Sequence, residues 1–75
     1  MAAAKRFSGS RLRELRERAN VSRIDLAYAC RRTEQMVYLW ERGRARPMPE
    51  VLDSIASAIS CERDELFEEV ADGAR

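Results

Sequence analysis

The sequence contains no histidine, and its only cysteines among 75 residues are Cys30 and Cys61. Structural zinc takes four cysteine or histidine ligands, so two cysteines do not make such a site. Without histidine, the chain also lacks the commonest general base and any Cys–His pair for nucleophilic catalysis. We therefore expect no metal, no cofactor, no small-molecule substrate and no enzymatic activity. Both cysteines fall at apolar positions of a helical pattern, which favours buried free thiols over a disulfide.

Long apolar runs are also absent. No run exceeds five residues, whereas a membrane-spanning helix needs roughly 20, and the first residues lack the apolar segment of a secretory signal. We expect a cytoplasmic protein with no membrane partner. Glycine and proline are scarce, at three and two residues, while leucine, alanine, arginine and glutamate are common. This composition favours helix throughout, and a hydrophobic share of 45% is enough for one small packed domain.

The net charge of +1 hides two opposite halves. Residues 1–46 carry 12 lysines and arginines against five acids, a net charge of +7, and residues 47–75 carry two arginines against eight acids, a net charge of −6. A basic half is what a surface facing a polyanion requires, while an acidic half keeps the rest of the chain away from phosphates. The split therefore indicates a nucleic-acid partner.

Helix start and stop signals divide the chain into five segments. Ser8 or Ser10 caps a first helix that runs to about residue 19. Ser22 caps a second helix that places Ile24, Ala27 and Cys30 inward, with Leu26 beside them. Thr33 caps a third helix that Gly43 ends. Two more helices follow, one beginning at residue 49 and one over about residues 63–70.

These segments predict an all-α fold, a compact five-helix orthogonal bundle. The second and third helices are short and closely joined, so they must cross steeply, which is helix-turn-helix geometry. We expect a flexible basic N-terminal arm at residues 1–7, a helix-turn-helix domain at residues 8–70 and a frayed tail at residues 71–75.

The stretch from Leu12 to Phe67 resembles the DNA-binding domain of phage repressor and Cro-like (XRE-type) regulators, a lambda-repressor-like domain. The matching segments are LRELR (12–16), SRIDLA (22–27), TEQMV (33–37), WERG (40–43), PE (49–50) and LF (66–67). Their ordered spacing, rather than any single motif, carries the resemblance.

The resemblance implies that the third helix enters the major groove of double-stranded DNA. Base readout would then fall to Gln35, Glu34, Met36 and Leu39, with Val37 and Trp40 packing inward. Gln35 is the strongest candidate, because its amide can pair bidentately with adenine. Contacts to the DNA backbone would come from Ser22, Arg23, Thr33, Tyr38, Arg42, Arg44 and Arg46. The family also pairs an arginine of the first helix with the glutamate before the glycine, here Arg16 with Glu41, as a structural ion pair.

The sequence departs from the family pattern at the turn, where glycine and an apolar residue are usual but Arg31 and Arg32 occur. Either Arg31 accepts a strained backbone, at a cost of about 1 kcal/mol or more, or the turn differs. The aliphatic stem of Arg32 could replace part of the lost apolar contact. Arg23 stands where glutamine is common, and Glu34 either accepts a hydrogen bond from cytosine or neutralises a neighbouring arginine.

Several roles stay open at the level of sequence. Tyr38 is either a phosphate contact or a plain surface aromatic, and Arg11 and Arg13 have the pattern of ordinary solvated charges. Leu66, Phe67 and Val70 either close the core or form the seam of a homodimer. A rival function is a protein-interaction module, such as an antitoxin or a protein that binds RNA polymerase or another regulator, which docks through the acidic half from Glu50 to Asp72.

Overall fold

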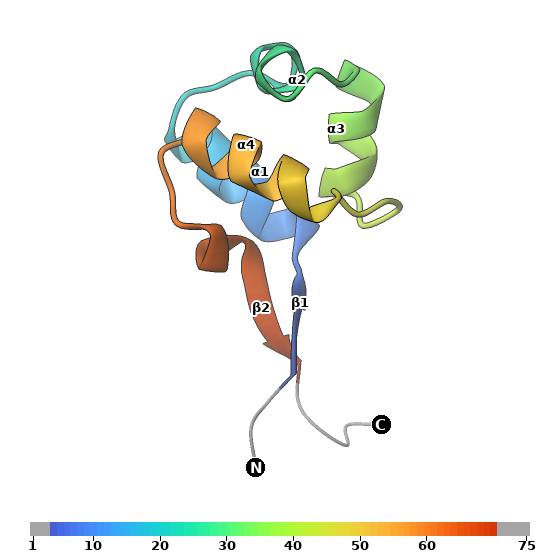
Figure 1. The fold of residues 1–75 in the computed structure, drawn as a ribbon, viewed down its shortest axis with the longest axis vertical. Helices are drawn as coiled ribbons and strands as arrows, with labels where there is room; N and C mark the ends of the chain where they lie inside the picture. The colour runs from blue at the N-terminus through green and yellow to red at the C-terminus, as the bar shows by residue number, and fades with distance from the viewer. Residues whose placement is uncertain (1–3, 71–75) are drawn as a thin grey trace.

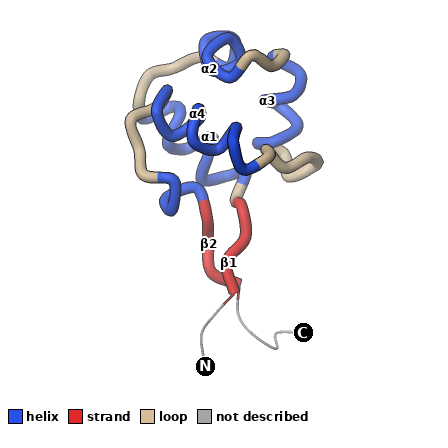
Figure 2. The backbone as a smooth tube through the Cα atoms, viewed as in Figure 1, coloured by secondary structure: helices blue, strands red, loops and turns tan. Residues whose placement is uncertain are grey.

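The computed structural model describes residues 4–70, and the helices gather at one end while a two-stranded ribbon extends from the other (Figure 1). In chain order the elements are β1 (Ala4–Phe7), α1 (Gly9–Arg18), α2 (Arg23–Cys30), α3 (Glu34–Glu41), α4 (Pro49–Ala58), the 3-10 helix η1 (Arg63–Leu66) and β2 (Phe67–Val70). The two described strands, β1 near the start of the chain and β2 near its end, pair with each other (Figure 2).

Local capping accounts for where three of the helices begin. The hydroxyl groups of Ser8, Ser22 and Thr33 each accept a hydrogen bond from the backbone N–H three residues later, at 3.0–3.2 Å. Asn20 and Gly43 follow α1 and α3 with φ angles of 62° and 75°, conformations that asparagine and glycine tolerate best. These starts and stops agree with the predicted ones, and Ser8 rather than Ser10 is the first cap.

One hydrophobic core joins all four α-helices and η1. The largest fully buried side chains are those of Trp40, Leu12, Leu26, Ile55, Leu66 and Val37. In α2 the buried residues are Leu26, Ala27 and Cys30, whereas Ile24 is 61% exposed. The expectation that Ile24 points inward was therefore wrong. Helix α2 packs on both α3 and α4 through the face that contains Leu26, and Ile24 lies outside that face.

The predicted fifth helix is the main error in the expected fold. The segment from Glu62 begins as a helix, with the Glu62 N–H donating to the Glu65 carboxylate at 2.9 Å in a capping box. It makes only the 3-10 turn η1 and then extends at Phe67 into β2. The described fold is therefore four α-helices, one 3-10 helix and a small antiparallel sheet, not a five-helix all-α bundle.

The reason lies in β1, because residues 4–7, expected in a flexible arm, pair with β2. Lys5 stands opposite Glu69 and Arg6 opposite Glu68, so each pair joins opposite charges across the strands. The Phe7 and Phe67 rings meet edge to face with centroids 6.4 Å apart. A strand partner 60 residues away thus satisfies the backbone of a segment whose local pattern also fits a helix.

The three residues considered for a dimer seam have different surroundings. Leu66 is fully buried in the core, and Phe67 is half-buried against Phe7. Val70 pairs through its backbone with Ala4 at the end of the ribbon. The start of the predicted arm (1–3) and the predicted tail (71–75) lie outside the described residues.

Both cysteines are free thiols, as the sequence indicated. Cys30 is buried at the end of α2 and Cys61 is half-buried before η1. Burial raises the pKa of both thiols, and the carboxylates of Glu65 and Glu62 raise that of Cys61 further. Neither thiol therefore has the lowered pKa of a reactive cysteine.

Candidate nucleic-acid interface

The turn between α2 and α3 adopts the strained backbone that the sequence offered as one outcome. Arg31 has φ 58° and ψ 44°, in the left-handed region. The Arg32 N–H donates to the carbonyl oxygen of Ala27 at 2.9 Å, which closes the end of α2. The exposed Arg32 guanidinium donates to the carbonyl oxygens of Arg31 and Cys30, at 3.1 and 3.4 Å. A cation is favourable there because the C-terminal end of a helix carries partial negative charge.

Helix α3 divides into a buried and an exposed face. Val37 and Trp40 are buried in the core, as expected. Glu34 and Gln35 are exposed at the start of the helix. Together with Tyr38 and Arg23 they line an open depression. The polar start of α3 is thus free to contact a ligand laid against the helix.

Met36 and Leu39, also expected to face DNA, are only half-buried. Met36 packs against the hydrophobic core with part of its side chain. Each residue therefore leaves part of its surface available beside Gln35.

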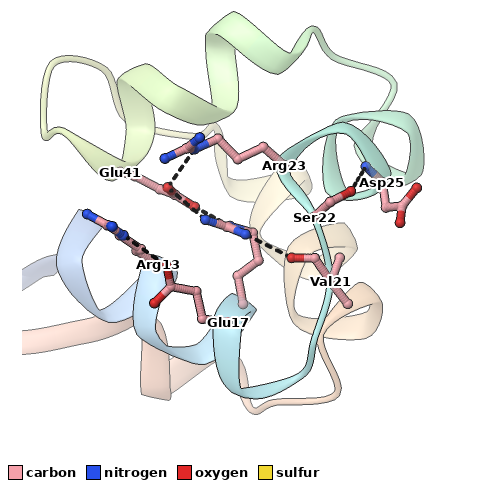
Figure 3. Close-up of polar contacts among 8 residues, drawn as sticks. Arg13, Glu17, Val21, Ser22, Arg23, Asp25 and Glu41 are labelled. Carbon is pink, nitrogen blue, oxygen red and sulfur yellow. Dashed lines mark hydrogen bonds and ion pairs between the residues drawn. The ribbon is translucent and has the colours of Figure 1, made fainter.

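A buried ion pair connects α1 to the end of α3. Arg16 and Glu41, the residues expected to pair, contact each other through two hydrogen bonds, and their side chains are only 8% and 2% exposed. Arg16 also donates to the carbonyl oxygen of Val21 at 2.9 Å. Arg23, at the start of α2, donates to the same Glu41 carboxylate at 3.1 Å (Figure 3). One carboxylate thus fixes α1, α2 and α3 relative to one another.

Tyr38 lies between two arginines on this surface. The guanidinium carbons of Arg23 and Arg42 are 5.6 and 5.8 Å from the centroid of its ring, within cation–π range. Arg23, assigned to the DNA backbone, is therefore held by Glu41 and by Tyr38. It remains one-third exposed, so its free side still faces solvent.

The loop after α3 presents the remaining predicted arginines. Arg42, Arg44 and Arg46 are all exposed. The Gly43 N–H donates to the carbonyl oxygen of Trp40 at 3.1 Å, and the Arg44 N–H to that of Leu39 at 2.9 Å. These bonds close the end of α3, so the loop leaves the helix in a defined direction.

Ser22 and Thr33 cap the starts of α2 and α3. Their hydroxyl oxygens accept hydrogen bonds from the backbone at 3.0 and 3.1 Å, so each hydroxyl proton remains free to donate. Both residues are exposed. They can therefore cap their helices and still donate to an anion such as a phosphate.

Gly9 is a positioning residue that the sequence interpretation missed. A Cβ atom at this position would lie 2.2 Å from the carbonyl oxygen of Trp40 and 2.6 Å from that of Glu41. Only glycine therefore lets the start of α1 approach the end of α3. The positive end of one helix dipole then meets the negative end of another. The available signal was a glycine in the first turn of a helix, where it is otherwise unfavourable.

Residues 4–70 contain neither a membrane-spanning helix nor a cluster of metal ligands. No helix in this part of the chain is long and apolar enough to span a bilayer. The same residues hold no group of three or more potential ligand side chains that could bind a metal ion.

Comparison with known proteins gives the chain its relatives. The protein family described as a helix-turn-helix domain matches residues 9–68 of this chain. A comparison with curated proteins finds no match. Among solved structures, the restriction-modification controller protein C.AhdI from Aeromonas hydrophila is 33% identical, with a TM-score of 0.72, over 77% of this chain and 88% of that one.

Two further structures have the same fold. The clp gene regulator ClgR from C. glutamicum is 29% identical, with a TM-score of 0.71, over 77% of this chain and 75% of its own. The P22 c2 repressor, solved in complex with a synthetic operator, is 24% identical, with a TM-score of 0.74, over 81% and 92% of the two chains. On the extent of the family match and the identity to C.AhdI, the chain belongs to the phage repressor/Cro-like family of helix-turn-helix domains.

Proposed function

We propose that the protein is a sequence-specific transcriptional regulator that binds double-stranded DNA with α3 in the major groove. The observation that carries this proposal is the surface around the start of α3. Glu34 and Gln35 are exposed there, and Arg23 and Tyr38 line the same depression. Polar side chains that can reach base edges, flanked by cations that can bind phosphates, are what groove recognition requires.

The relatives support a regulatory role. C.AhdI is a controller protein, ClgR is a gene regulator, and the P22 c2 repressor was solved with operator DNA. We infer that this chain likewise regulates transcription, as a repressor-type regulator.

Within this proposal each side chain has a definite task. Gln35 reads adenine through its amide, and Glu34 accepts a hydrogen bond from the amino group of cytosine. The exposed parts of Met36 and Leu39 contact thymine methyl groups. Phosphates bind to Ser22, Arg23, Thr33, Tyr38, Arg42, Arg44 and Arg46.

Selection of bound sequences from a random duplex pool would identify the preferred site, after which two variants separate readout from charge. Gln35→Ala should relax the preference at one base position. Arg44→Ala should weaken binding to all sequences alike and reduce the magnitude of the salt slope by about 0.9. If Gln35→Ala leaves the preference unchanged, Gln35 is not the readout residue.

The same selection addresses dimerisation. Two copies that bind paired half-sites produce a palindromic consensus, with half-site centres about 34 Å apart or a multiple of that distance. Because Leu66 is fully buried within one chain, we propose that such a pair contacts through exposed residues instead. A consensus without symmetry would argue for binding as a monomer.

If the purified protein has no affinity for duplex DNA even at low salt, the proposal fails. The rival interaction module, which would dock through its acidic half, then becomes the better account.

A further inference from the structure

Helix α1 carries four arginines, of which one is buried and two have contacts away from the proposed DNA face. Arg16 is buried against Glu41. Arg11 donates to the backbone carbonyl of Glu65 in η1 at 2.6 Å. Arg18 pairs with Glu14 at 3.7 Å and borders a depression lined by residues 59–61, after α4, and by Glu65 of η1. The fourth arginine, Arg13, lies on a different surface.

Arg13 lines an open depression where α1, α2 and α3 meet. Arg23 and Arg42 line it too, and so do Ser10, Tyr38 and Glu41. Figure 3 shows Arg13 and Arg23 on opposite sides of Glu41. Glu41 is the only acid among the described residues of this lining, and it is already bound by Arg16 and Arg23. Arg13 also pairs with Glu17 outside this lining, but the arginines here still outnumber the acids, and a bound anion offsets that excess of positive charge.

A second depression continues from the first toward the ribbon. It shares Ser10, Glu41 and Arg42 with its neighbour. Its added charged residues are Arg46, Arg6 from β1 and Glu68 from β2. The pairing of β1 with β2 fixes the backbone of Arg6. Arg6 therefore occupies a set place beside the loop after α3, which a flexible arm would not give it.

The guanidinium groups of Arg13 and Arg6 are held only by exposed ion pairs. Arg13 pairs with Glu17 at 3.2 Å and Arg6 with Glu68 at 3.5 Å, and every side chain in these pairs is at least 41% exposed. Exposed ion pairs contribute little stability and exchange readily with solvent. A DNA phosphate has one negative charge and two free oxygens, as a carboxylate does, so it can replace the carboxylate as the partner of either guanidinium, and the release of counterions from DNA favours that exchange.

We propose that the DNA backbone continues past α3 onto α1 and β1, where Arg13 and Arg6 each bind a phosphate. This inference rests on the proposed DNA-binding function and adds two contacts from elements that the recognition helix does not include. It assigns Arg13 a role in place of the solvated charge that its sequence pattern indicated.

The test compares two double variants that have the same net charge. Arg6→Gln with Arg13→Gln removes the proposed contacts. Arg18→Gln with Arg63→Gln removes two exposed arginines elsewhere, each paired only with a surface acid. Affinity for the selected duplex is measured from 50 to 200 mM salt, and circular dichroism with thermal melting verifies that both variants are folded.

The first variant should lower the magnitude of the log–log salt slope by about 1.8, at 0.9 for each lost phosphate contact. Over this fourfold change in salt, its affinity should fall about 12-fold less than that of the parent. The second variant should keep the parental slope. Equal slopes in parent and first variant, or an equal loss in both variants, would overturn the assignment while leaving the proposed function intact. If the parent protein does not bind duplex DNA at all, both the proposed function and this assignment of Arg6 and Arg13 fail.

Discussion

The Glu41 carboxylate provides a sharp energetic test of how the helices are held. Glu41→Gln removes the negative charge and leaves the Arg16 guanidinium, only 8% exposed, without a counter-charge. Breaking a buried pair in this way costs about 3–5 kcal/mol. A domain of 75 residues has a free energy of unfolding of about 4–11 kcal/mol. The substitution should therefore remove a large part of the stability.

The two sides of the pair should differ. Arg16→Met leaves Glu41 buried, but Arg23 still contacts its carboxylate at 3.1 Å. The cost should therefore be smaller than that of Glu41→Gln, at about 2 kcal/mol, including the hydrogen bond lost at the Val21 carbonyl. Replacing both partners, with Arg16→Met and Glu41→Leu together, removes the uncompensated charge. That double variant should lie within about 1–2 kcal/mol of the parent.

Urea unfolding at pH 7, followed by circular dichroism and by the fluorescence of the single tryptophan, measures these differences if the slope m is unchanged. Arg23→Gln is the control, since an exposed partner should contribute about 1 kcal/mol or less. A cost below about 1 kcal/mol for Glu41→Gln would refute the reasoning. So would a double variant that loses as much stability as Glu41→Gln alone.

Three substitutions and two measurements on Cys30 test other features. Gly9→Ala should destabilise the domain by about 3 kcal/mol in thermal melts, because the new Cβ would overlap the Trp40 carbonyl oxygen, 2.2 Å away. Arg31→Gly should stabilise it by about 1 kcal/mol, since φ is 58° there, and Gly43→Ala, at φ 75° with open space around it, should cost a similar amount; a destabilised Arg31→Gly would contradict the strain argument. Burial raises the pKa of the Cys30 thiol, so alkylation at pH 8 should be much slower in the folded protein than in urea. Because the folded state favours the protonated thiol, the free energy of unfolding is unaffected by Cys30 below pH 9 and falls as pH rises from there through the folded pKa.

The sequence determined the features that depend on residues close together in the chain. The caps at Ser8, Ser22 and Thr33 act through the backbone three residues ahead, so a short window of sequence reveals them. The division of α3 into a face with Val37 and Trp40 and a face with Gln35 follows from helical periodicity. The Arg16–Glu41 pair came from the family resemblance, and the structure contains it.

Only the tertiary structure decided the features that depend on distant partners. Residues 67–70 form a strand because residues 4–7 supply the hydrogen-bonding partner, which no local pattern within 62–70 could indicate. Arg13 and Arg18 look equivalent in the sequence, yet Arg13 borders the junction of three helices and Arg18 borders the segment between α4 and η1. Burial and charge at such a junction come from several segments at once, and the way those segments pack sets the surface that a DNA phosphate could meet.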